Sequence, residues 1–266
     1  MGAMFGMLKP RPPVDDDEYD WLLACFAWLS REFGGNSGLR GATLVLPSRD
    51  FFPHSKLTGH DRALELFEQV KALAGMTEWQ CDLIPGAASR EHRVTTGHGL
   101  KHEGKGPPLG TFGYANGRYQ ITYNPASLAD PATLVATFAH ELSHYLIHSA
   151  QTAPPGGREL EEHATDLAAV FMGFGVLMAN SAKAFDQFQN FGEMGWQMEA
   201  RGYLSENALT TGLALFVVAS GADAAIAEAA LKDYLRKPFR RAVKAIRRDH
   251  PDLSTELRVM DLADWR

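Results

Sequence analysis

Apolar residues recur at helical spacing along most of the chain and alternate only in short stretches. The helical spacing predicts two amphipathic helices in the first third, at residues 15–35 and 61–75. Short apolar runs predict buried strands at residues 42–47 and 79–85. Alternation on both sides of an Asn-Gly pair predicts a β-hairpin within residues 110–124.

The second half of the chain has the pattern of successive helices. Asp130 is a good N-cap and Pro131 a good first residue for a helix that continues to about residue 150. A Pro-Gly turn ends it, and a long helix follows. Further helices are expected near residues 182–200, 205–220, 223–235 and 238–248.

This order of elements predicts an α+β fold, with a small mixed sheet followed by helices. We expect a flexible N-terminus at residues 1–14, an α+β domain at 15–181, and a helical C-terminal region at 182–266 packed on it. Residues 86–110 have no apolar period, which predicts a long surface loop. Its histidines are expected to be solvated: His92, His98 and His102.

The composition is that of an ordinary globular protein: 266 residues, 45% hydrophobic and 22% charged, with a net charge of -6. An acidic balance argues against a nucleic-acid partner, because nucleic-acid-binding proteins usually carry a basic surplus. Cys25 and Cys81 form no C-x-x-C pair, so we expect buried thiols in a reducing compartment.

Neither a signal peptide nor an apolar run of about 20 residues is evident, so we expect a soluble, cytoplasmic protein with no membrane contact. The oligomeric state stays open.

Near the C-terminus, basic residues recur every four positions and predict a solvated helix face, with an acidic partner as the alternative. These residues are Lys232, Arg236, Arg240, Lys244 and Arg248, and Pro238 interrupts the row.

The chemistry of the chain centres on HELSH, which places His140, Glu141 and His144 in the pattern H-E-x-x-H. Residues four apart lie on one helix face, so both histidines can bind one zinc ion. Glu141 is rotated by about 100° from His140 and reaches the space beside the ion, where a general base must stand. The alternative is a polar helix face with solvated histidines.

Zinc needs a third protein ligand, and the following helix offers one. Glu162 and Asp166 are four residues apart and share a face. Glu162 can bind the ion, while Asp166 can accept the free ring N–H of a ligand histidine and fix its orientation.

Three other residues compete for these roles. His148 lies about 12 Å along the helix axis from His140, too far to share one ion with it. Glu161 has a threonine four residues on where Glu162 has an aspartate. His163 is expected to point toward the packed side of its helix.

HELSH followed by EHATD resembles the gluzincin group of zinc metallopeptidases, whose pattern is H-E-x-x-H and then E-x-x-x-D on a following helix. The match covers residues 112–176, and some other segments look like uncharacterised bacterial proteins that carry this motif. The resemblance implies a zincin-like domain with one Zn²⁺ per chain. Its ligands would be His140, His144 and Glu162. Glu141 would be the general base, and Asp166 would accept a hydrogen bond from the ring N–H of a ligand histidine.

The leading hypothesis is therefore a zinc-dependent metallopeptidase that hydrolyses peptide or protein substrates by Glu-assisted attack of zinc-bound water. The alternative is a zinc-binding interaction or regulatory protein with the same fold and no turnover. Intact Glu141 argues against the alternative, because a structural site needs no base. A weaker third hypothesis is a metal hydrolase that acts on a non-peptide amide.

Two parts of the site stay open at this level. In gluzincin-like enzymes the strand before the active-site helix usually forms an edge that pairs with substrate, and residues 118–124 stand in that position. An ordinary edge strand is the alternative. A hydrogen-bond donor for the oxyanion is also needed, and no spacing selects one among Tyr145, Tyr203 and His250.

Overall fold

The computed structural model of the protein describes residues 11–35, 39–86, 109–115, 117–189 and 203–265. These residues are mostly helical and include a small mixed sheet of three strands, as the α+β prediction requires. The strands are β1 (Cys81–Pro85), β2 (Gly110–Ala115) and β3 (Arg118–Tyr123). The α-helices are α1 (Asp16–Phe33), α2 (Gly59–Leu73), α3 (Pro131–His148), α4 (Glu161–Ala169), α5 (Gly175–Gln189), α6 (Glu206–Ser220), α7 (Ala224–Ala230), α8 (Asp233–Asp249) and α9 (Leu253–Val259).

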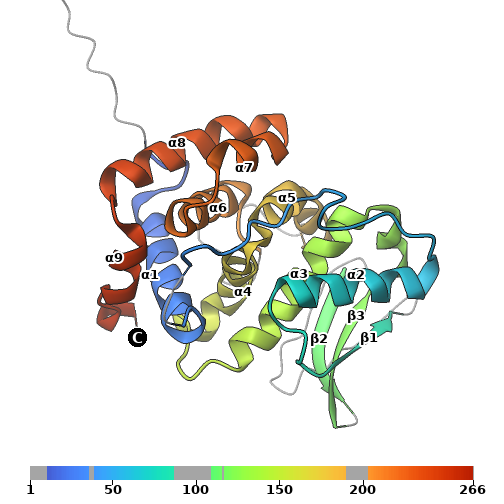
Figure 1. Ribbon diagram of the computed structural model, residues 1–266. Coiled ribbons are helices and arrows are strands. Elements are labelled where there is room, and N and C mark those ends of the chain that lie inside the picture. The colour runs from blue at the N-terminus through green and yellow to red at the C-terminus, as the bar shows by residue number, and fades with distance from the viewer. Residues whose placement is uncertain (1–10, 36–38, 87–108, 116, 190–202, 266) are drawn as a thin grey trace, which may run out of the picture.

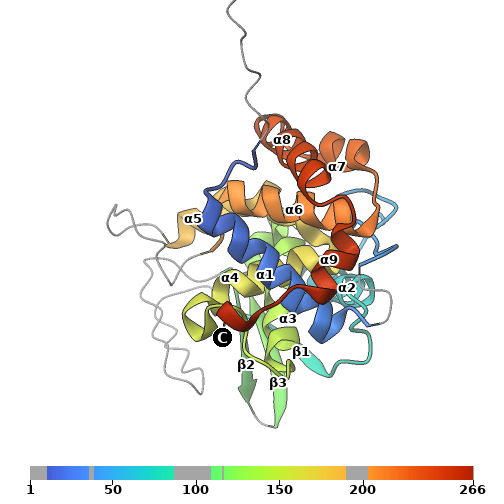
Figure 2. The same cartoon turned by 90° about the vertical axis from the view of Figure 1, so that its left-hand side faces the viewer.

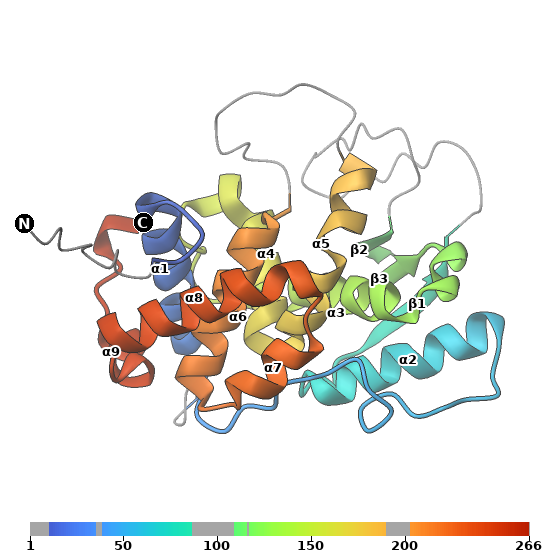
Figure 3. The same cartoon turned by 90° about the horizontal axis from the view of Figure 1, so that it is seen from above.

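The elements form layers that place α3 between the sheet and the helices α4, α6 and α8. Figure 2 shows this order, with α8 at the top, then α6 and α4, then α3, and the sheet at the bottom. In Figures 1 and 3 the sheet and α2 lie on one side of the molecule, and α1, α8 and α9 lie on the other. Apolar side chains from α1, α3, α4 and α6 fill the interior, so the helix that carries HELSH is packed on several sides.

The strand order is β1-β3-β2, with β3 parallel to β1 and antiparallel to β2. The predicted hairpin is confirmed, and Tyr114 of β2 stands opposite Tyr119 of β3. The expectation that residues 118–124 offer a free edge is wrong, because β3 is bonded on both sides. Within the described residues, β2 is the edge strand nearest α3.

Residues 42–47 form no strand, so that prediction is also wrong. The Val45 N–H instead donates to the carbonyl oxygen of Gly173 at 3.0 Å. Gly173 lies in a π-helical turn, η3 (Val170–Phe174), with φ of 100°, and an added Cβ would stand 2.2 Å from the Thr43 carbonyl oxygen. The run thus lies against a helix kink with Val45 buried, and glycine is required at position 173 for that approach.

Helix boundaries follow local signals closely. The Asp130 side chain accepts a hydrogen bond from the Thr133 N–H, as an N-cap does. The helix expected at residues 238–248 instead begins at Asp233, so Pro238 lies inside α8, whose apolar side packs on α6. Both cysteines are free thiols, with Cys25 buried and Cys81 half-buried.

Within the described residues, one helical stretch, Gly157–Lys183, is long and apolar enough to cross a bilayer by length and composition alone. In its most apolar window 89% of the residues are buried inside the protein, which is also typical of a core helix. The stretch comprises a short 3₁₀ turn, η2 (Gly157–Leu160), then α4, η3 and the start of α5.

Candidate metal centre

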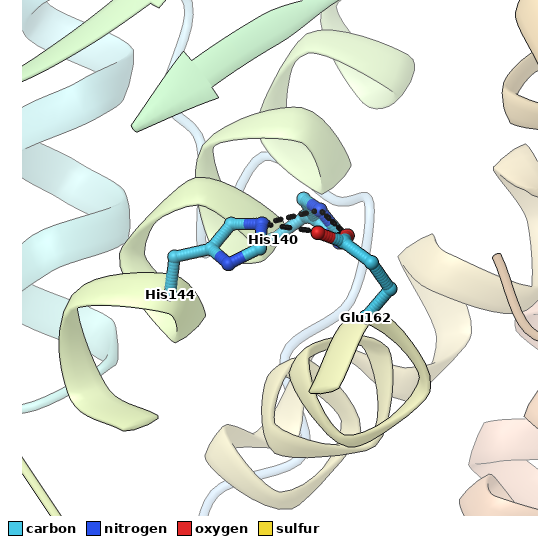
Figure 4. Close-up of side chains that lie close together, drawn as sticks. All are labelled: His140, His144 and Glu162. Atoms are coloured by element: carbon cyan, nitrogen blue, oxygen red, sulfur yellow. Dashed lines mark hydrogen bonds and ion pairs between the residues drawn. The ribbon is translucent and has the colours of Figure 1, made fainter. Parts of the chain in front are cut away.

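Three side chains converge between α3 and α4 (Figure 4). His140 and His144 come from successive turns of α3, and Glu162 comes from the first turn of α4. The Nε2 atoms of the two histidines are 3.1 Å apart. Glu162 Oε2 is 3.7 Å from His140 Nε2 and 3.6 Å from His144 Nε2. The three atoms therefore form a nearly equilateral triangle.

This triangle fits a zinc ion. Ligands at about 2.0–2.1 Å in a tetrahedral arrangement lie about 3.3 Å from one another, and the observed separations bracket that value. Two histidines and one carboxylate also form a donor set that zinc accepts while keeping one coordination position open. The two helices thus bring together a group that could hold a metal ion.

Asp166 fixes the orientation of His140. Its Oδ1 accepts a hydrogen bond from His140 Nδ1 at 2.9 Å, which leaves Nε2 directed toward Glu162. Its Oδ2 accepts the backbone N–H of Leu204 at 2.7 Å. Asp166 is 1% exposed, so both bonds are shielded from water. One carboxylate therefore joins the candidate metal centre to the chain that enters α6.

The surroundings of the two histidines shift their pKa values in opposite directions. Burial alone would lower the pKa of His140, but the hydrogen bond and charge of Asp166 raise it to about 9, with help from Glu141 and Glu162. Burial lowers the pKa of His144 to about 4. His144 is thus neutral at pH 7, the form in which a histidine binds a metal ion, whereas an ion at His140 Nε2 would have to displace a proton.

His144 has contacts of its own outside the triangle. The Thr165 hydroxyl donates to the Glu161 carbonyl at 2.8 Å, and its oxygen lies 3.4 Å from His144 Nδ1. Phe112 of β2 lies parallel to the imidazole, with ring centroids 6.3 Å apart. Sequence reasoning did not assign Thr165 a role here, although it follows Glu162 by three residues and so lies near the same side of α4.

Glu141 lies beside the triangle and is 3% exposed. Its Oε2 is buried and has no hydrogen-bond partner among the described residues. Burial raises the pKa of this carboxyl to about 7, with the charge of His140 opposing and that of Glu162 adding to the shift. A buried carboxylate oxygen with unused bonding capacity suits a group that exchanges protons with a bound water.

The structure also places the competing residues. His148 is exposed at the end of α3, with its ring against Tyr119, away from the triangle. Glu161 is exposed. His163 is buried against Trp21, as expected for the packed side of α4. Of the loop predicted at residues 86–110, most lies outside the described residues, including His92, His98 and His102.

Tyr203 reaches the site from a distant part of the chain. Its ring meets that of His140 edge-on, with centroids 5.0 Å apart. Burial raises the pKa of its hydroxyl well above the ordinary value, and the carboxylates of Glu141, Asp166 and Glu162 add to the shift. By contrast, Tyr145 packs on Trp79 and Tyr119, and His250 pairs with Glu256 near α9. Of the three candidate donors, Tyr203 is the one that contacts His140.

Comparison of the chain with protein-family models, curated proteins and solved structures finds no match in any of the three. The chemistry of the site is therefore inferred from its own geometry.

Proposed function

We propose that this protein is a zinc-dependent metallopeptidase. The observation that carries the proposal is the triangle of His140, His144 and Glu162 with the buried Glu141 carboxylate at its side. A structural zinc site is usually closed by four ligands and needs no base, whereas this arrangement has three ligands and an unpartnered carboxylate oxygen among the described residues.

Zinc held by the three ligands would supply a Lewis acid that polarises a carbonyl group and makes water more acidic. Glu141 would take the proton from the attacking water on its Oε2 and pass it to the leaving amine. Asp166 would hold the His140 ring so that Nε2 keeps its lone pair toward the ion.

Tyr203 is the residue that we assign to the developing oxyanion. A phenol is protonated at neutral pH and can donate a hydrogen bond, and the raised pKa of the Tyr203 hydroxyl extends this to more alkaline pH. Its ring contacts that of His140, which supports a position beside the candidate metal centre. A donor fixed in a buried site stabilises charge more strongly than one in water.

Metal content and peptide hydrolysis of the wild type and of Glu141→Gln test the proposal together. The wild type should hold about one zinc per chain and cleave members of a peptide library detected by mass spectrometry. The variant should keep its zinc and lose about 10²- to 10⁴-fold in rate. Full activity in the variant would show that Glu141 is not the base. Zinc bound by a wild type that cleaves no peptide would favour a binding role instead.

A further inference from the structure

Four aromatic side chains form a continuous cluster beside the candidate metal centre, and we call it the aromatic platform. Phe112 stacks on Tyr119 with ring centroids 5.5 Å apart, and Tyr145 contacts both of these rings. Tyr114 meets the Tyr119 ring edge-on at 5.0 Å. The four rings come from β2, β3 and α3, so their meeting is a product of tertiary packing.

The platform begins at the metal centre. The Phe112 ring lies parallel to that of His144, with an interplanar angle of 8°. Two residues earlier on β2, a Cβ at Gly110 would lie 2.8 Å from Glu141 Oε1. Because alternate residues of a strand share a face, Gly110, Phe112 and Tyr114 line one path that starts at Glu141 and leads away from it.

The far end of this path is open to solvent. Tyr114 is 67% exposed, whereas Phe112, Tyr119 and Tyr145 are half-buried. Single exposed apolar residues are common on proteins, but Tyr114 continues a contact network that reaches a candidate metal ligand. Six large apolar side chains are exposed in the described chain, and Tyr114 alone of them joins this network: Leu57, Leu64, Tyr114, Ile226, Tyr234 and Val259.

The chemistry of the platform selects an uncharged, ring-bearing ligand. Its four side chains carry no formal charge at neutral pH, and the adjacent Arg118 is paired with Asp82 at 3.0 Å. Aromatic rings favour offset or edge-on partners at centroid separations of about 4.5–7 Å, as the rings already do among themselves. An additional ring can therefore extend the cluster from Tyr114 and Phe112.

We propose that the aromatic platform binds an aromatic side chain of the substrate next to the bond that is cleaved. The inference rests on the proposed peptidase function and adds a substrate class: peptides with Phe, Tyr or Trp beside the scissile bond. On the edge strand β2, Phe112 lies two residues, or about 7 Å, from Gly110, which packs on Glu141. A substrate ring on Phe112 therefore leaves the neighbouring peptide bond near the candidate metal centre.

The test compares two quenched fluorescent peptides that differ only by Phe or Ala at one central position. The zinc-loaded wild type should cleave the Phe peptide with a kcat/KM about tenfold or more above that of the Ala peptide. Tyr114→Ser should reduce this preference by about threefold to tenfold, mainly through a higher KM for the Phe peptide. Tyr234→Ser, an exposed tyrosine on α8, is the matched control and should keep the full preference.

Equal cleavage of the two peptides by the wild type, or an unchanged preference in Tyr114→Ser, would overturn the inference while the peptidase proposal stands. If neither peptide is cleaved, the peptidase proposal fails. A binding measurement then tests separately whether the platform is an aromatic site. Saturation-transfer NMR with N-acetyl-phenylalanine amide and N-acetyl-alanine amide should then show contact with the first compound, lost in Tyr114→Ser. Equal signals from both amides would overturn the platform as an aromatic site.

Discussion

Gly110 of β2 packs directly against the side chain of Glu141 on α3. A Cβ at position 110 would lie 2.8 Å from Glu141 Oε1, 3.0 Å from its Cγ and 2.8 Å from Thr137 Cγ2. These separations are shorter than real carbon contacts, so the glycine fixes how closely the sheet approaches HELSH. The sheet thus helps to position the candidate base without contributing a polar group to it.

Gly110→Ala should therefore reduce hydrolysis without releasing zinc. The new methyl group must push the Glu141 carboxylate aside, and small displacements of a catalytic group can lower rates by about tenfold to a hundredfold. Gly113→Ala on the same strand is the control, because a Cβ there meets nothing within 4 Å. Steady-state kinetics with metal analysis measures both effects, and equal rates in the two variants would refute a positioning role for Gly110.

Glu162→Ala should weaken zinc binding by at least about tenfold, since it removes one corner of the ligand triangle. Glu161→Ala removes the exposed neighbouring carboxylate and should leave zinc affinity within about twofold of the wild type. Competition with a chromogenic chelator gives both affinities. If Glu161→Ala weakens zinc binding and Glu162→Ala does not, Glu161 is the third ligand.

Asp166→Asn should lower both zinc affinity and stability. Its two carboxylate oxygens each accept one hydrogen bond, from His140 Nδ1 and from the Leu204 N–H, but an amide has only one acceptor oxygen. Zinc affinity should fall by about tenfold to a hundredfold. The zinc-free protein should lose about 1–3 kcal/mol of unfolding free energy, because one buried donor remains unpaired.

Chemical denaturation of the zinc-free proteins separates these two effects of Asp166. Asp252→Asn changes an exposed aspartate that pairs with Arg40 and should cost less than about 1 kcal/mol. If Asp166→Asn leaves the zinc-free protein as stable as Asp252→Asn does, the bond to Leu204 makes no net contribution.

Tyr203→Phe should retain zinc and lose about 10²- to 10³-fold in kcat, because it removes only the hydroxyl that we assign to the oxyanion. Tyr145→Phe is the matched control. It also removes a phenol oxygen near the site but keeps its ring contacts with Trp79 and Tyr119. A large loss in Tyr145→Phe alone would transfer the role to that residue.

Local sequence determined the parts of the site that depend on helix geometry. His140 and His144 share a face because four residues make about one helical turn, and the same period aligns Glu162 with Asp166. Asp130 and Pro131 marked the start of α3 through capping, and the Asn-Gly pair marked the hairpin. These signals are carried by residues within a few positions of one another.

Tertiary structure decided which distant segments meet. The parallel partner β1 makes β3 a central strand, and the strand predicted at residues 42–47 instead packs on the kink at Gly173. Tyr203 reaches His140 because Asp166 binds the neighbouring backbone of Leu204. Such contacts depend on packing between elements far apart in the chain, and residue type and spacing alone do not encode them.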